Sequence, residues 1–229
     1  MEKPPHIAPQ GPAARSPRAP LWEVLAAYVP LLVVFKALYL AGGVARTVLD
    51  VLVPVAWIYA PVLVLIRTRR DFDAYALTLR DWPRGVRLAL AAASVVLPLF
   101  CAGYFALHGF GDGRWIASPL RWRFVRDAAS QVLVVAYPEE IFFRGYMQTR
   151  LNDLFVRRVR VLGTPLSASV VVTSALFAVG HFVIHPDPSR LAVFFPSLVF
   201  GWLRERSGSV VASGLFHGLC NVTVLLLEG

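Results

Sequence analysis

The sequence predicts an all-α protein, a polytopic bundle of about seven transmembrane helices, and three observations lead to this prediction. Of its 229 residues, 57% are hydrophobic and only 16% are charged, whereas soluble domains carry about 25% charged residues. The apolar residues form long runs, and most runs approach the roughly 20 residues that cross a bilayer. Short arginine clusters separate these runs, which is typical of the loops between membrane spans.

The elements follow one another at regular intervals. Residues 1–20 are rich in Pro and Ala and have no apolar period, which predicts a disordered tail. Residues 21–229 are predicted to form one membrane domain. Its apolar runs predict helices at 22–44, 46–66, 86–107, 124–150, 166–184, 191–203 and 209–227. The third run is the most uniformly apolar, and the sixth is short enough to be tilted or incomplete.

The basic residues predict how this bundle is oriented. If the N-terminus is cytoplasmic, most loop arginines fall on the cytoplasmic side, among them the clusters at 67–70, 157–160 and 204–206. The positive-inside bias therefore predicts a multi-pass protein of the cell membrane with a cytoplasmic N-terminal tail.

The formal net charge of +9 also raises the question of nucleic-acid binding. The arginines lie in short clusters between apolar runs rather than along one basic surface, so nucleic acid is not expected as a partner. The same pattern favours contact with the anionic lipids of a bilayer.

Two adjacent glutamates and an arginine interrupt the fourth apolar run, in the stretch PEEIFFRG. A charge at the bilayer centre costs about 2.5–3.5 kcal/mol on insertion scales, so such residues are functional candidates. Glu140 and Arg144 are spaced i,i+4 and can form an ion pair. Glu139 lies about 100° further around the helix, and Pro138 loosens the helix beside it. An ion pair that joins helices explains Glu140 and Arg144, but it leaves Glu139 free to act as a general base.

Two later helices carry histidines at the same spacing. Phe177 and His181 are i,i+4 in SALFAVGHFVIHP, and His217 and Asn221 are i,i+4 in GLFHGLCNVTV. A lone histidine in an apolar helix is more often a core residue. Two histidine-bearing helices beside an acidic helix favour a shared polar site instead.

In this order, the patterns EExxxR, FxxxH and HxxxN resemble the type II CAAX prenyl endopeptidase family, also described as CPBP or Abi glutamic intramembrane proteases. The resemblance covers roughly residues 125–225. It implies hydrolysis of a peptide bond inside the bilayer, with no metal and no cofactor. It further implies that Glu139 activates water with help from His181, that His217 and Asn221 hold the oxyanion, and that Glu140, Arg144 and Phe177 support them.

The Arg- and Ala-rich composition indicates a bacterial protein, which would place it in the inner membrane. Some bacterial relatives resemble sorting proteases that process C-terminal membrane anchors, the myxosortase-like role, and others belong to bacteriocin self-immunity systems. The expected partner is thus a membrane-anchored protein or peptide that serves as substrate.

Two alternatives stay open at this point. A zinc protease could use His181, His217 and a glutamate as ligands, although no HExxH motif is present and Asn221 is a poor zinc ligand. A non-catalytic immunity or transport-type protein could use the same pocket to bind a proton or a ligand.

Overall fold

The computed structural model describes residues 19–109 and 122–228, which form seven helical rods and one short β-hairpin. The predicted all-α class is confirmed. Most of the predicted tail, residues 1–20, lies outside the described residues, and the first helix begins at Ala19.

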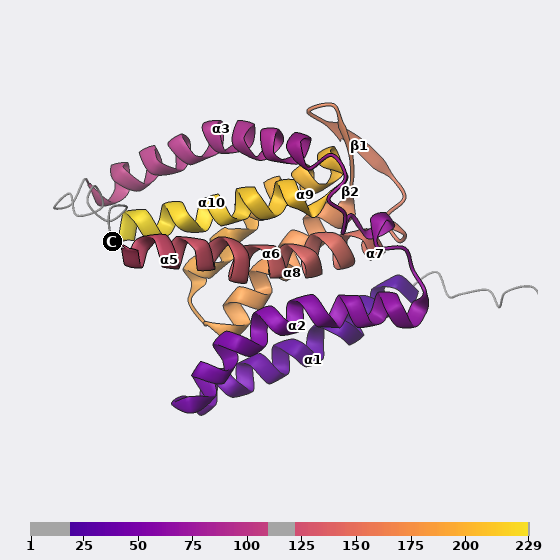
Figure 1. Cartoon of the computed structure of the whole chain (residues 1–229), viewed down its shortest axis with the longest axis horizontal. Coiled ribbons are helices and arrows are strands. Elements are labelled where there is room, and N and C mark those ends of the chain that lie inside the picture. The colour runs from indigo at the N-terminus through magenta and orange to yellow at the C-terminus, as the bar shows by residue number, and fades with distance from the viewer. Residues whose placement is uncertain (1–18, 110–121, 229) are drawn as a thin grey trace, which may run out of the picture.

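The first two helices, α1 (Ala19–Ala41) and α2 (Val44–Thr68), form an antiparallel pair on one side of the bundle (Figure 1). Gly42 and Gly43 make the turn with φ angles of 67° and 50°. Glycine suits these positions because a Cβ atom disfavours the left-handed region. The following segment contains the short turn η1 (Asp73–Tyr75) and leads to α3 (Trp82–His108).

The fourth rod is continuous from residue 122 to 152 but changes its winding around Pro138. It consists of α5 (Trp122–Ser130), η3 (Gln131–Ala136), α6 (Tyr137–Glu140), η4 (Ile141–Gln148) and α7 (Thr149–Asn152). The stretches η3 and η4 are π-helical, with wider turns than an α-helix. Proline lacks a backbone N–H and crowds the carbonyl four residues earlier, which wider turns can accommodate. The loosening that Pro138 predicts is therefore present on both sides of the two glutamates.

A β-hairpin follows this rod where the sequence indicates only a loop. Strands β1 (Arg158–Val161) and β2 (Thr164–Ser167) pair antiparallel through the turn at Leu162 and Gly163. Four residues per strand are too few for a reliable signal of alternation in a membrane sequence. The next helix begins at residue 168 because the Ser167 side chain accepts a hydrogen bond from the Ser169 backbone N–H and caps it.

The remaining rods are α8 (Ala168–Ile184), α9 (Phe194–Ser207), preceded by the turn η5 (Pro188–Val193), and α10 (Val210–Glu228). Helix α10 lies between α3 and the fourth rod (Figure 1). Close approach requires small residues there, because a Cβ added at Gly214 would lie 2.6 Å from the Tyr137 ring. This contact brings α10 against the segment that carries the glutamates.

In residues 19–109 and 122–228, four helices are long and apolar enough to cross a membrane, namely α1, α2, α3 and the stretch Val210–Leu227 of α10. Large apolar side chains such as Val51, Leu99 and Leu107 are exposed on the outside of the bundle, as expected for surfaces in contact with lipid. The chain is a multi-pass membrane protein.

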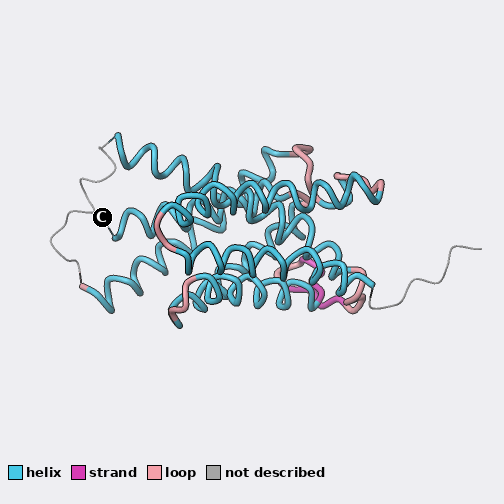
Figure 2. The backbone as a smooth tube through the Cα atoms, turned by 90° about the horizontal axis from the view of Figure 1, so that it is seen from below, coloured by secondary structure: helices cyan, strands magenta, loops and turns pink. Residues whose placement is uncertain are grey.

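The segments that carry the basic clusters lie at one end of the bundle, where α2 and α9 end and α3 and α10 begin (Figure 1). The strands of the hairpin lie at the same end, away from the C-terminus (Figure 2). Arg84 donates to the backbone oxygen of Arg206 over 3.3 Å, and Arg70 and Arg150 both bind Glu23. We call this the basic end. Its assignment to the cytoplasm stays a prediction from the positive-inside rule.

Candidate active site

The fourth rod carries a buried ion pair in the middle of the bundle. Glu140 and Arg144 have no exposed side-chain surface, and Oε1 of Glu140 lies 3.1 Å from Nη1 of Arg144. The predicted i,i+4 pair is thus present. Arg144 also donates through Nη2 to the side chain and the backbone oxygen of Ser197 on α9, which fixes the guanidinium between two helices.

His217 connects the ion pair to the neighbouring glutamate. From α10 its Nδ1 lies 3.1 Å from Oε1 of Glu140, and its Nε2 lies 3.7 Å from Oε2 of Glu139. The imidazole stacks on Phe200 at a centroid distance of 4.5 Å, and Phe177 meets it edge-on. These contacts hold the ring so that each nitrogen lies near a different carboxylate.

A cavity of about 400 Å³ opens beside this cluster between α1, α2, the fourth rod and α8. Glu139 and His181 both line it, whereas Glu140 does not. The walls are mainly apolar and include Trp57, Phe143 and Phe177. The volume lies in the range of ligand-binding pockets. This geometry agrees with the expectation that the side chains of Glu139 and Glu140 have different surroundings, because only Glu139 lines the cavity.

His181 lines the same cavity as Glu139. Its Nδ1 lies 2.9 Å from the backbone oxygen of Phe177, so the hydrogen-bond capacity of Nε2 is left for the cavity. No direct hydrogen bond joins His181 to Glu139 among the described residues. Phe177 packs against both His181 and His217, with centroid distances of 4.4 and 5.7 Å, and so it contacts both imidazoles.

Asn221 is the predicted site residue that the structure leaves apart from the cluster. It lies one turn beyond His217 on α10 and is half-buried. In the described part of the chain its side chain has no hydrogen bond to either glutamate or to His217. The site thus joins Glu139, Glu140, Arg144, Phe177, His181 and His217.

Several buried polar atoms of the cluster lack a hydrogen-bond partner within the described residues. Within the described residues, Oε2 of both glutamates and Nε of Arg144 are buried without a hydrogen-bond partner. Each such atom costs about 1–3 kcal/mol. Unsatisfied buried groups in a folded protein call for an explanation, and a catalytic role is one of the recognised explanations.

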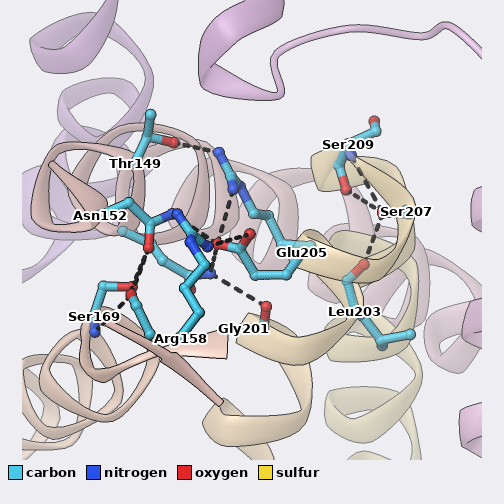
Figure 3. A network of polar contacts seen from close by, with 12 residues as sticks. Thr149, Asn152, Arg158, Ser169, Gly201, Leu203, Glu205, Ser207 and Ser209 are labelled. Carbon is cyan, nitrogen blue, oxygen red and sulfur yellow. Dashed lines mark hydrogen bonds and ion pairs between the residues drawn. The ribbon is translucent and has the colours of Figure 1, made fainter. Parts of the chain in front are cut away.

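Sequence reasoning missed a second polar network, one turn further along the fourth rod. Gln148 and Asn152 donate to Oε1 of Glu205 over 2.9 and 2.8 Å, and Arg204 pairs with the same oxygen over 2.9 Å. Asn152 in turn accepts from Ser169 on α8 (Figure 3). The signal was available, because Glu140, Arg144, Gln148 and Asn152 recur at intervals of four on one helix face. We call this network the Glu205 hub.

Glu23 on α1 is another carboxylate that accepts several hydrogen bonds, as Glu205 does. It takes two hydrogen bonds from Arg70, two from Arg150 and one from Tyr146. No sequence pattern links these residues, which come from three separate rods. Ser197 was missed for the same reason.

Among the residues described, no group of three or more His, Cys, Asp or Glu side chains is arranged to hold a metal ion. Both histidines of the site, His181 and His217, instead pack against the ring of Phe177.

Comparison with known families gives one result. Residues 121–223 match the family model described as type II CAAX prenyl endopeptidase Rce1-like. No curated protein and no solved structure matches the chain. The matched segment contains both glutamates, Arg144, both histidines of the cluster and Asn221, and the family suggests a protease that acts on a protein substrate in a membrane. The match shows that this segment, a little less than half of the chain, is similar to the type II CAAX prenyl endopeptidases.

Proposed function

We propose that this protein is a glutamic-type intramembrane endopeptidase that hydrolyses a peptide bond near the C-terminus of a membrane-associated protein. The observation that carries the proposal is the different surroundings of the two adjacent glutamates. Arg144 and His217 hold Glu140, whereas Glu139 faces a cavity that it shares with His181. A free carboxylate beside a cavity is suited to remove a proton from water.

The proposed reaction uses Glu139 as the general base. As its carboxylate takes a proton from water, the water oxygen attacks the scissile carbonyl carbon and forms a tetrahedral oxyanion. The C–N bond then breaks, and the proton passes from Glu139 to the leaving amine. The products are a carboxylic acid and an amine, which exchange a proton to become a carboxylate and an ammonium ion, so atoms and charges balance. His181, on the cavity wall, orients the water through Nε2.

The oxyanion needs donors placed in advance, and preorganised donors of this kind supply a large part of catalysis. His217 contributes in this role only when both of its nitrogens carry protons, because Nδ1 then donates to Glu140 while Nε2–H points to the Glu139 side. Asn221, one turn away, becomes the second donor if the substrate draws it into the cavity.

We further propose that the substrate is a surface protein with a C-terminal membrane anchor and that the enzyme resides in a bacterial inner membrane with its N-terminus in the cytoplasm. The apolar cavity walls suit an uncharged peptide segment. The bias of arginines toward one end of the bundle supports the orientation.

The test compares cells that contain the wild-type protein, Glu139→Gln or Glu205→Gln at matched amounts. Glu205→Gln is the control because it makes the same chemical change at a glutamate outside the cavity. C-terminal peptides of the membrane proteome are then quantified by mass spectrometry. We expect uncleaved C-terminal anchors to accumulate only with Glu139→Gln.

The outcomes separate the alternatives. If Glu139→Gln cells and wild-type cells have the same C-terminal peptides and the same biological activity, the general-base proposal fails and a non-catalytic role is favoured. Once a substrate is identified, cleavage by purified protein in the presence of a strong chelator tests the zinc alternative. Loss of cleavage that zinc restores would overturn the glutamic mechanism.

A further inference from the structure

We propose that the β-hairpin at the basic end is a docking surface for the anionic headgroups of the membrane in which the bundle lies. The surface consists of β1, the turn residues Leu162 and Gly163, and the preceding Val156 and Arg157. This inference is independent of the proposed catalytic function, because none of these residues belongs to the candidate active site.

The hairpin combines exposed arginines with exposed apolar side chains. Along β1, Arg158 and Arg160 point to one face, while Val159 and Val161 point to the other. Val159 is 70% exposed and Val156 is 77% exposed. A loop surrounded by water gains no stability from exposed apolar side chains, whereas a segment at a membrane interface presents basic and apolar groups together.

The residue at the tip strengthens this interpretation. Leu162 is 80% exposed and has a φ of 49°. Asn, Asp or Gly is favoured at this position of a two-residue hairpin turn, and a leucine there costs folding free energy. A large apolar side chain in a strained, exposed position is explained if the tip enters the apolar edge of the headgroup region.

Contacts with α9 hold the hairpin at the basic end of the bundle. Its strands run crosswise to the helices at the basic end (Figure 1), which places them parallel to the plane of the membrane. Trp202 on α9 donates its indole N–H to the backbone oxygen of Val161 over 3.1 Å, and tryptophan is enriched at membrane interfaces. Arg158 lies 3.8 Å from Glu205, so the Glu205 hub fastens the strand to the bundle.

Further positive charge surrounds the tip. A Cβ placed at Gly163 would lie 3.5 Å from Nη1 of Arg206, and Arg84 contacts the Arg206 backbone. Arg157 and Arg160 have no ion-pair partner among the described residues. Free arginines beside an anionic leaflet attract its phosphates within a Debye length. This charge favours lipid phosphate over a protein partner as the occupant.

The test places a fluorophore at the tip and measures its contact with defined lipids. Leu162→Cys, in a background with Cys101→Ala and Cys220→Ala, is labelled with bimane, and the full-length protein is reconstituted in phosphatidylcholine nanodiscs. A small fraction of either phosphatidylglycerol or phosphatidylcholine is brominated near the headgroup. We expect brominated phosphatidylglycerol to quench several-fold more strongly than brominated phosphatidylcholine at the same fraction, and aqueous iodide to quench weakly.

Two double variants make the test specific. Arg157→Gln with Arg160→Gln should bring the quenching ratio of the two lipids close to one, as should high salt. Arg67→Gln with Arg69→Gln removes the same charge from the same end outside the hairpin and should retain the preference. The proposal is overturned if both lipids quench equally while Arg157 and Arg160 are present, or if iodide reaches the tip freely. It is also overturned if both double variants lose the lipid preference equally.

Discussion

The candidate active site and the Glu205 hub both include side chains of the fourth rod, but their carboxylates have different surroundings. Glu205 accepts hydrogen bonds from Gln148, Asn152 and Arg204 through one oxygen. Glu139, only nine residues before Gln148, has no side-chain hydrogen bond within the described residues, lies 3.7 Å from Nε2 of His217 and lines a cavity. In this protein the hydrogen-bonded carboxylate joins helices, whereas the carboxylate of the proposed general base has no hydrogen bond within the described residues.

The difference has a physical cause. A buried charge is tolerated when several donors replace the water it has lost. In the hub those donors come from the fourth rod and α9, so their hydrogen bonds fix the positions of these two rods. The active site keeps buried polar atoms without partners, which costs stability but leaves directed groups that a water or a substrate can engage. The following predictions test this contrast.

The largest expected effect is on activity. Glu139→Gln keeps the size of the side chain but cannot accept a proton from water, so we expect cleavage to fall by about 10²- to 10⁴-fold. The melting temperature in detergent should stay close to that of the wild type, because the glutamate has no ion-pair network to lose. A large fall in melting temperature would show that Glu139 is structural, like Glu205.

The second effect is on stability within the site. Arg144→Met removes the main partner of a fully buried carboxylate, and we expect a loss of about 3–5 kcal/mol in the free energy of unfolding. Adding Glu140→Gln should recover part of this loss, because the remaining side chain is no longer charged. Denaturant unfolding in detergent measures both variants. A double variant no more stable than the single one would contradict the ion-pair account.

The third effect concerns the hub. Glu205→Gln retains an oxygen for Gln148 and Asn152 but removes the charge that faces Arg204, so we expect a loss of about 1–3 kcal/mol in unfolding free energy. Cleavage per folded molecule should equal that of the wild type. If cleavage falls as far as with Glu139→Gln, the two regions do not differ in the way proposed.

The smallest effect is expected for Ser197→Ala. It removes one acceptor from the Arg144 guanidinium, while the backbone oxygen of residue 197 still accepts, so the expected loss is about 1 kcal/mol. Ser197→Thr, which keeps the hydroxyl, serves as the control, and thermal unfolding compares the two. A destabilisation as large as that of Arg144→Met would mean that Ser197 carries more of the site than its two contacts indicate.

Much of the fold was predictable because lipid exposure leaves a strong pattern in the sequence. Long apolar runs between arginine clusters indicated seven helices, and the order and approximate bounds of these helices are confirmed. The hairpin was not predictable from four-residue strands. The bounds of α8 also shifted, because a capping serine decided where the helix begins.

The candidate site was partly predictable for a similar reason. Charges are rare in membrane helices, so Glu139, Glu140 and Arg144 stood out, and their i,i+4 spacing indicated which glutamate is paired. Their catalytic roles remain predictions. Ser197 and Glu23 gave no signal, since serine is common in apolar helices and Glu23 finds Arg70 and Arg150 only after three rods meet.

The sequence by itself determined that the chain crosses a membrane, that three charges lie within the fourth rod, and that Glu140 can reach Arg144. These features follow from local periodicity, which helix geometry translates directly into positions on one face. Only the tertiary structure decided that His217 lies between the two glutamates, that Glu139 opens to a cavity with His181, and that Asn221 lies apart. Such contacts depend on how closely glycine-lined helices approach one another, and that distance is set by packing between segments far apart in the chain.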